Sequence, residues 1–188
     1  MSWLSDLAAI VAVDLSPTAL DAHAADVSGH HPVRPEAVAY PNTAREVASV
    51  LAWANERAVP VTPWGAGTSV EGNPIPVRGG ISLSLERMDR VKQVRLSDRL
   101  AVVEAGVKYR ALNRQLSGTG WQFAVEIGGD ATIGGMIANN AAGPKAVKYG
   151  AARAHLLGLE VALADGRLLR TGGQSGSGSS SDSSAGSQ

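Results

Sequence analysis

One glycine-rich stretch, Pro63-Trp64-Gly65-Ala66-Gly67-Thr68-Ser69-Val70-Glu71-Gly72, restricts the folds open to this chain more than any other segment. It follows Val59-Pro60-Val61, a short apolar run typical of a buried strand. Its glycines leave the backbone nearly bare, so several N–H groups can turn toward one ligand, and Thr68 and Ser69 add hydroxyl donors. An anion with many oxygens, such as a pyrophosphate, suits this arrangement.

The stretch matches neither of the two common phosphate-binding motifs. No Gly-Lys-Ser/Thr follows it, so it is not a P-loop, and its glycine spacing differs from the dinucleotide-binding fingerprint of Rossmann folds. The prolines of Asn73-Pro74-Ile75-Pro76 also prevent a helix from beginning at once. Taken alone, the stretch is also typical of an ordinary glycine-rich turn between strands.

Composition excludes several classes of protein. The chain has 188 residues, enough for one core or two small subdomains, and its net charge of zero favours neither nucleic acid nor an anionic membrane as a partner. It has no cysteine, which excludes disulfides, thiolate metal sites and a cysteine nucleophile. The apolar run Leu7–Val13 is too short for a transmembrane segment and lacks the basic flank of a signal peptide. We therefore expect a cytoplasmic protein, with peripheral attachment to a membrane as an alternative.

The two ends of the chain differ from its middle. Residues 1–34 predict an N-terminal helical segment, with one helix after Ser2 and a second from Ser16-Pro17 to about Asp26. His30 and His31 are interpreted as solvated loop residues, because adjacent histidines do not have the spacing of a metal site. Residues 175–188 are almost entirely serine and glycine and predict a flexible tail, so we expect the ordered protein to end near Gln174, as in a truncated chain.

Residues 35–90 predict a first α/β subdomain. Strands are expected at 37–40, 59–62 and 81–85. Asn42 or Thr43 is expected to cap a helix that runs through about Arg57 and whose apolar residues form one buried face. A strand, a helix and a strand in so short a span indicate a parallel crossover. The glycine-rich stretch then leaves the carboxyl end of the second strand, where open α/β sheets bind ligands.

Residues 91–174 predict a second α/β subdomain. It begins with a hairpin of strands 91–96 and 100–104, followed by a helix over 109–116. A second glycine-rich segment runs from Gly128 to Gly143, in which Thr132 can cap a short helix of small residues. Strands at 156–164 and 167–170 form a last hairpin across Asp165-Gly166.

The order of these motifs resembles one protein family over residues 35–173. The glycine-rich stretch, Glu104-Ala105-Gly106-Val107, Thr132-Ile133-Gly134-Gly135 and Lys148-Tyr149-Gly150 are similar to the FAD-linked oxidases with a vanillyl-alcohol-oxidase or PCMH-type FAD-binding domain. Within that family the chain looks most like the glycolate oxidase FAD subunit and the flavin D-lactate dehydrogenases. The resemblance implies an α+β fold, the PCMH-type FAD-binding fold, with the flavin between two α/β subdomains.

The resemblance also implies which residues bind FAD. The residues implied for the pyrophosphate are Gly65, Ala66, Gly67, Thr68, Ser69 and Gly72. Those implied for the diphosphate or ribityl chain are Gly128, Gly129, Thr132, Ile133 and Gly134. Those implied near the flavin ring are Asn139, Ala142 and Gly143, with Gly150 and Val161 as further contacts. The chain departs from the family where Ile127-Gly128-Gly129-Asp130 replaces a Pro-Gly turn, and its first glycine-rich stretch contains no histidine, so noncovalent FAD is expected.

The resemblance implies a reaction for the parent family but not for these residues alone. The family oxidises a 2-hydroxy acid, such as D-lactate or glycolate, by hydride transfer to FAD and passes electrons to a quinone, a cytochrome or a partner subunit. The family's substrate domain does not follow here, so a cofactor-binding module without turnover and a truncated product without function remain alternatives. No catalytic residue and no metal ligand is assigned. The acid–base candidates form no convincing pair and are interpreted as solvated or structural; they are Glu71, Glu126, Asp130, Lys148 and His155.

Overall fold

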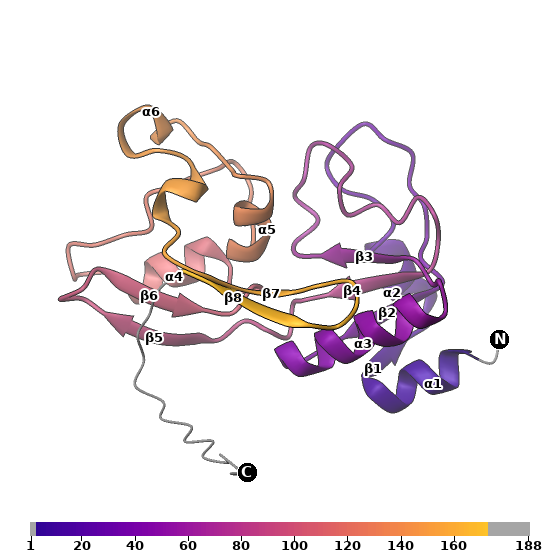
Figure 1. Ribbon diagram of the computed structural model, residues 1–188. Helices are drawn as coiled ribbons and strands as arrows, with labels where there is room; N and C mark the ends of the chain where they lie inside the picture. Colours follow the sequence, from indigo (N-terminus) through magenta and orange to yellow (C-terminus); the bar gives the residue numbers. More distant parts are fainter. Residues whose placement is uncertain (1–2, 173–188) are drawn as a thin grey trace, which may run out of the picture.

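The computed structural model describes residues 3–172, so the predicted tail, residues 175–188, lies outside the described part of the chain. The described residues form two units that lie side by side, each with its own sheet and its own apolar core (Figure 1). The first unit extends to Ser84 and the second begins at Val91. This agrees with the two expected α/β subdomains, whose exact limits remain a proposal.

A four-stranded sheet organises the first unit. Its strands are β1 (Ala12–Asp14), β2 (Ala37–Tyr40), β3 (Val61–Trp64) and β4 (Ile81–Ser84), in the order β1-β2-β4-β3. β4 pairs in parallel with β2 on one side and with β3 on the other. All residues of β4 are buried, as expected for a strand paired along both edges. The predicted parallel arrangement is confirmed, and the third predicted strand lies between the first two.

Helix α3 (Ala44–Glu56) makes the crossover between β2 and β3. The side chain of Thr43 accepts a hydrogen bond from the Glu46 N–H at 3.1 Å and so caps the helix, as its sequence predicts. Its inner face, which includes Val50 and Trp53, packs on the sheet and closes the first core. Burial of such apolar faces is the main source of stability in a unit of this size.

The N-terminal residues differ from the expected helical segment. Helices α1 (Trp3–Ile10) and α2 (Pro17–Ala22) are present, but β1 lies between them and pairs antiparallel with β2. The apolar run Leu7–Val13 is therefore divided between a helix and a strand. The strand gives hydrogen-bond partners to the edge of β2 that would otherwise be open, which explains why tertiary pairing overrides the local pattern. The prediction of a helical segment was thus incomplete.

The second unit begins with the predicted hairpin of β5 (Val91–Arg95) and β6 (Leu100–Val103). Helix α4 (Tyr109–Gln115) follows. Three short helices come next, namely α5 (Ile133–Ala138), α6 (Ala146–Tyr149) and the 3-10 helix η1 (Ala152–His155). The core of this unit gathers side chains from α4, α5 and the segment between them, including Leu112, Val125 and Met136.

The last hairpin and one buried carboxylate join the two units. Strands β7 (Leu159–Ala162) and β8 (Leu168–Thr171) pair across Asp165-Gly166 as predicted, and the backbone at Gly166 packs against α3 of the first unit. The Glu104 side chain, only 2% exposed, accepts a 2.8 Å hydrogen bond from Arg90, whose Nη2 also lies 3.4 Å from the carbonyl oxygen of Asn42 in the first unit. Sheets and helices are mixed within each unit, so the expected α+β class is confirmed.

Candidate functional site

The first glycine-rich loop leaves the carboxyl end of β3, as the sequence predicts. Trp64, the last residue of β3, is buried, and its ring lies directly against the backbone of Gly67. A Cβ atom on Gly67 would come within 2.7 Å of the Trp64 ring, and the φ of +63° at Gly67 is strained for any residue with a side chain. The loop therefore requires glycine at position 67 in its own right.

The backbone of this loop offers a run of unused donors. Within residues 3–172, none of the N–H groups of residues 65–70 donates a hydrogen bond to a protein acceptor. Loops rarely leave so many consecutive donors without a protein partner. Because the residues of this run from Gly65 to Ser69 are half-buried and carry small side chains, the loop can direct several N–H groups at one anion.

The second glycine-rich loop has the same property. An isolated bridge pairs Thr132 with Lys108, and the Thr132 side chain caps α5 by accepting the Gly135 N–H at 3.2 Å. These contacts fix the end of the loop, while the N–H groups of residues 128–132 donate to no acceptor in the described part of the chain. The capping prediction for Thr132 is confirmed.

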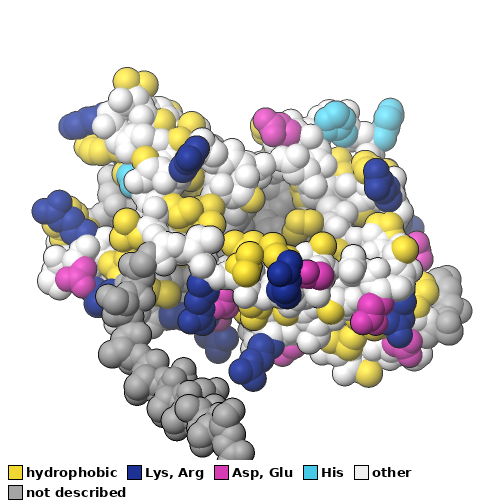
Figure 2. Space-filling view, viewed as in Figure 1, with side chains coloured by type: hydrophobic (Ala, Val, Ile, Leu, Met, Phe, Trp, Pro, Cys, Tyr) yellow, Lys and Arg dark blue, Asp and Glu magenta, His cyan; other side chains and the backbone are white. Residues whose placement is uncertain are grey.

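The fold brings the two loops together. A Cβ atom on Gly65 would lie 2.5 Å from Thr132 Oγ1, and one on Gly129 would lie 3.2 Å from Thr68 Cγ2. Beyond them, Asn73 Nδ2 donates a 2.6 Å hydrogen bond to Asn139 Oδ1. Figure 2 shows the surface dipping between the lobe with α5 and α6 and the lobe with the loops after β3, and the atoms there are mostly backbone or polar side chains.

Other predicted site residues have structural reasons to be where they are. A Cβ atom on Gly134 would lie 2.8 Å from the carbonyl oxygen of Ala105, and one on Gly143 would overlap the carbonyl oxygen of Glu126 at 1.5 Å. Ile133 is buried in the second core, so only its backbone can face a ligand. These glycines allow the chain to pack on itself, which by itself does not indicate ligand contact.

The remaining predicted residues are scattered or already engaged. The Gly72 N–H donates to the Asp26 carboxylate at 2.8 Å and is thus not available to a phosphate, although the sequence analysis assigned it there. Ala142 is exposed, Gly150 ends α6 with a φ of +85°, and Val161 lies half-buried in β7. Their contacts with FAD stay predictions.

Asp26 and Asn73 are site residues that the sequence analysis missed. Asp26 lies 46 residues before Gly72, and no motif joins them. Asn73 follows the glycine-rich loop directly and was considered only as a helix breaker. Asp130 was interpreted as solvated or structural, yet its Oδ1 atom is buried and has no hydrogen-bond partner among the residues described. A hydroxyl of a bound ligand could donate to it.

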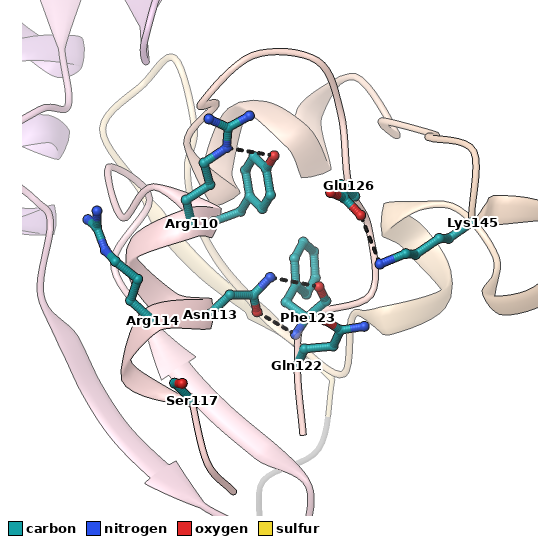
Figure 3. Close-up of a pocket in the computed structure, with 9 residues that line it drawn as sticks. Arg110, Asn113, Arg114, Ser117, Gln122, Phe123, Glu126 and Lys145 are labelled. Carbon is teal, nitrogen blue, oxygen red and sulfur yellow. Dashed lines mark hydrogen bonds and ion pairs between the residues drawn. The ribbon is translucent and has the colours of Figure 1, made fainter. Parts of the chain in front are cut away.

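Of the other acid–base candidates, Glu71 belongs to the first glycine-rich loop, whereas Glu126 borders a separate pocket. Glu126 pairs with Lys145 at 2.8 Å, and this hydrogen bond lowers the pKa of the Glu126 carboxyl. The pair lines a pocket of about 540 Å³ beside α4, in which the Asn113 amide is bonded to the backbone of Phe123 (Figure 3). The lining includes none of the predicted cofactor-binding residues.

Metal and membrane sites can be assessed over the same residues. No cluster of three or more His, Cys, Asp or Glu side chains that could hold a metal ion occurs between residues 3 and 172. Over that same range, each helix is too short or too polar to cross a lipid bilayer. The chemistry that the structure does offer is anion binding by backbone N–H groups from two facing loops.

The two facing loops fit a diphosphate ester. Each loop supplies several N–H groups without protein partners among the described residues, and the nearest side chains at the junction are the Thr132 hydroxyl and the Thr68 methyl group. The side chains that would crowd a ligand are absent because glycine stands at positions 65, 67, 128 and 129. FAD, which carries a diphosphate between two bulky groups, is therefore compatible with this site.

Comparison with known proteins agrees with this geometry. Residues 35–172 match the family described as "FAD binding domain". The chain is 39% identical over 180 residues to a D-lactate dehydrogenase of Archaeoglobus fulgidus, covering 93% of this chain and 40% of the relative. It is 36% identical over 162 residues to a probable mitochondrial D-lactate dehydrogenase of Danio rerio, covering 86% of this chain and 33% of the relative.

Solved structures share the fold. Alkyldihydroxyacetonephosphate synthase superposes with a TM-score of 0.81 at 21% identity, over 95% of this chain and 36% of that one. Identity this low indicates a common fold only. In each of these comparisons the chain spans between 33% and 40% of the length of the protein that it matches.

Proposed function

The chain belongs to the FAD binding domain family, and on this premise we propose that residues 65–69 and 128–132 hold the diphosphate of FAD between the two units. The observation that carries the proposal is the pair of facing N–H runs without protein acceptors. A diphosphate would give these donors charged acceptors, and hydrogen bonds to charged groups contribute about 1.5–3 kcal/mol each.

Individual residues take different parts in this proposal. Gly65, Ala66 and Gly67 present backbone N–H groups, while the Thr68 hydroxyl can donate a further hydrogen bond. The Thr132 side chain keeps the second loop in place by capping α5. Asn139, which is tied to Asn73, marks the side on which we place the flavin ring.

We also propose that the FAD is bound without a covalent link. The chain has no cysteine, and no histidine lies in either glycine-rich loop. Acid precipitation of the FAD-loaded protein should release all the flavin into the supernatant. Yellow colour in the washed pellet would show that a side chain outside the loops forms a bond to the flavin.

A larger protein that contains this domain would oxidise a 2-hydroxy acid. The D-lactate dehydrogenases among the relatives support this substrate class, and bound FAD would supply the hydride acceptor. A quinone, a cytochrome or a partner subunit would take the electrons. Since the chain spans only about a third of these relatives, we propose that the present residues supply the cofactor site and not the substrate site.

The binding proposal is tested by titrating the 188-residue chain with FAD and following flavin fluorescence. Gly67→Val should abolish binding, because the branched side chain would collide with the Trp64 ring at a strained φ and so change the shape of the loop that presents the N–H groups. Gly118→Val is the matched control, since Gly118 also has a positive φ, of +80°, but has no neighbour within 4 Å. Equal FAD affinity in the folded Gly67→Val variant and the wild type would contradict the placement.

Turnover is tested separately under anaerobic conditions. The FAD-loaded chain is mixed with D-lactate or glycolate and the flavin absorbance is followed. We expect no rapid bleaching, because oxidation needs a base for the hydroxyl proton and a cation for the carboxylate, and we propose that these groups belong to the parts of the longer relatives that this chain does not span. Rapid bleaching by the chain alone would show that it carries its own substrate site.

A further inference from the structure

A short segment before the family match lies on the first glycine-rich loop. We call this segment, residues 24–33, the clamp segment; it leads from α2 toward β2 and ends before residue 35, where the family match begins. A 2.9 Å hydrogen bond from the Val33 N–H to the Ala24 carbonyl oxygen closes the segment into a loop of its own.

Asp26 makes the central contact between the clamp segment and the glycine-rich loop. One carboxylate oxygen accepts the Gly72 N–H at 2.8 Å, and the other accepts the Ser28 N–H at 2.9 Å. Burial alone would raise the pKa of Asp26, but hydrogen bonds from Ser28, Gly72 and Ser69 outweigh it and hold the pKa below its usual value. The carboxylate is therefore charged at neutral pH and accepts hydrogen bonds from the clamp segment and from the glycine-rich loop.

Two further contacts extend this junction. The Val27 N–H donates to the Ser69 carbonyl oxygen at 3.1 Å, and the His30 ring lies so close to Gly72 that a Cβ atom there would be 2.7 Å from His30 Cδ2. His30 and its neighbours also border a pocket of about 350 Å³ together with Glu71 of the glycine-rich loop and Ile75, which follows the loop. His30 is thus exposed, as expected, but it is also a contact of the loop.

The loop has few other supports. Its residues 65–70 donate no backbone hydrogen bonds within the described range, so nothing in their own backbone fixes their shape. Trp64 and Thr132 hold the start of the loop, whereas Asp26 and Val27 hold its end. Ordering a flexible backbone on binding costs conformational entropy at each residue, and a loop that is ordered before binding spares the ligand that penalty.

We propose that Asp26 is a positioning residue, and that through it the clamp segment holds the glycine-rich loop in the shape that binds the cofactor. The carboxylate engages the Gly72 N–H and places a negative charge at that end of the loop, so the diphosphate is confined to residues 65–69. The link to FAD rests on the proposed function, whereas the effect on loop order does not.

The test compares three variants of the whole chain. Asp26→Ala removes the hydrogen bonds of the carboxylate with Gly72 and Ser28. Asp26→Asn keeps an oxygen that can accept the Gly72 N–H but loses the charge. Asp21→Ala is the matched control, because Asp21 pairs with Arg34 in the same N-terminal region and makes no hydrogen bond or ion pair with the loop within residues 3–172. Backbone order parameters of residues 65–70 are measured by NMR without FAD, and FAD affinity is then measured by fluorescence.

In the wild type and in Asp21→Ala we expect order parameters near about 0.85, and in Asp26→Ala values below about 0.6 at residues 65–70 only. FAD affinity should fall about 10-fold in Asp26→Ala and by less in Asp26→Asn, with the thermal unfolding of both units nearly unchanged. In the wild type, lowering the pH through the folded-state pKa of Asp26 should weaken FAD binding, and this step should be absent in Asp26→Asn.

Each outcome decides one part of the proposal. Unchanged loop order in both Asp26 variants would overturn the clamp. A disordered loop with unchanged FAD affinity would overturn its role in cofactor binding. If the wild type binds no FAD, the proposed function fails, and the order parameters still decide whether Asp26 fixes the loop.

Discussion

The two glycine-rich loops look alike in sequence but need glycine for different reasons. In the first loop, Gly67 has a positive φ and lies on the Trp64 ring, and the end of the loop is held by Asp26 from a distant segment. In the second, Gly134 and Gly143 allow the backbone to approach another stretch of the same unit. Glycine therefore lets the first loop turn against neighbouring side chains, whereas in the second segment it lets two stretches of backbone touch.

This difference predicts which substitutions affect the stability of the protein and which affect its affinity for FAD. A side chain at Gly65 or Gly67 meets another side chain, Thr132 or Trp64, so the loop that we propose for FAD must change shape. A side chain at Gly134 or Gly143 must displace a backbone carbonyl group, which cannot move without moving the second core. Substitutions in the two loops should therefore differ most in whether they affect stability or affinity.

The largest effect should come from Gly143→Ala. The new Cβ atom would lie 1.5 Å from the Glu126 carbonyl oxygen. We therefore expect the free energy of unfolding to fall by about 4 kcal/mol or more, which leaves the chain largely unfolded. Gly128→Ala is the contrasting variant, because nothing lies within 4 Å of a Cβ atom there. It should unfold like the wild type while binding FAD more weakly. Circular dichroism on heating checks the stability of both variants, and flavin fluorescence checks the FAD affinity of Gly128→Ala. A stable Gly143→Ala would show that the segments of Gly143 and Glu126 are not packed together.

A smaller effect is expected at the support of the second loop. Gly134 packs on Ala105, and the preceding residue, Glu104, is buried and bonded to Arg90. The hydrogen bond from Arg90 holds the pKa of Glu104 below its usual value despite burial. Glu104→Gln should lower the free energy of unfolding by about 2 kcal/mol at pH 7, because a neutral amide would replace the buried carboxylate and its charged hydrogen bonds with Arg90 would be lost.

The same carboxylate should make the stability of the protein depend on pH, and its pKa fixes the direction of that dependence. Because the pKa of Glu104 is lower in the folded state than its unfolded value of about 4.3, its contribution to stability is full above that value and disappears as the pH falls through the folded-state pKa. Denaturant unfolding between pH 7 and pH 3 should show this step in the wild type and not in Glu104→Gln. Glu160→Gln, which breaks an ion pair with the exposed Arg170, is the control and should change little.

The sequence predicts those parts of the molecule that depend on neighbouring residues. The caps at Thr43 and Thr132 and the hairpin at Asp165-Gly166 all depend on contacts within a few positions, and all are confirmed. The resemblance to FAD-linked oxidases is confirmed by the family match. The strand β1 was missed, because its reason to form is the open edge of β2 rather than any local pattern.

The candidate site was harder to predict than the fold. The sequence located both glycine-rich loops, but the fact that they face each other depends on the packing of two units. Asp26 is joined to Gly72 across 46 residues, and a single sequence carries no sign of that contact. Gly72 itself was assigned to the pyrophosphate because a motif does not show which N–H groups are already bonded.

The smallest effect tests directly whether the loops touch. Gly65→Ala should be destabilising, because its Cβ atom would lie 2.5 Å from Thr132 Oγ1, which cannot rotate away without releasing the Gly135 N–H. Thr132→Ala loses the cap, worth about 1 kcal/mol, but it also removes the colliding oxygen. The double variant should therefore be more stable than the sum of the single effects by about 1 kcal/mol, measured by denaturant unfolding.

Gly129→Ala combined with Thr132→Ala is the comparison pair, because a Cβ atom at Gly129 meets Thr68 instead, and the effects of these two substitutions should add. Strict additivity for Gly65 and Thr132 as well would mean that the two loops stand apart in solution, and the facing N–H groups could not then bind one diphosphate together.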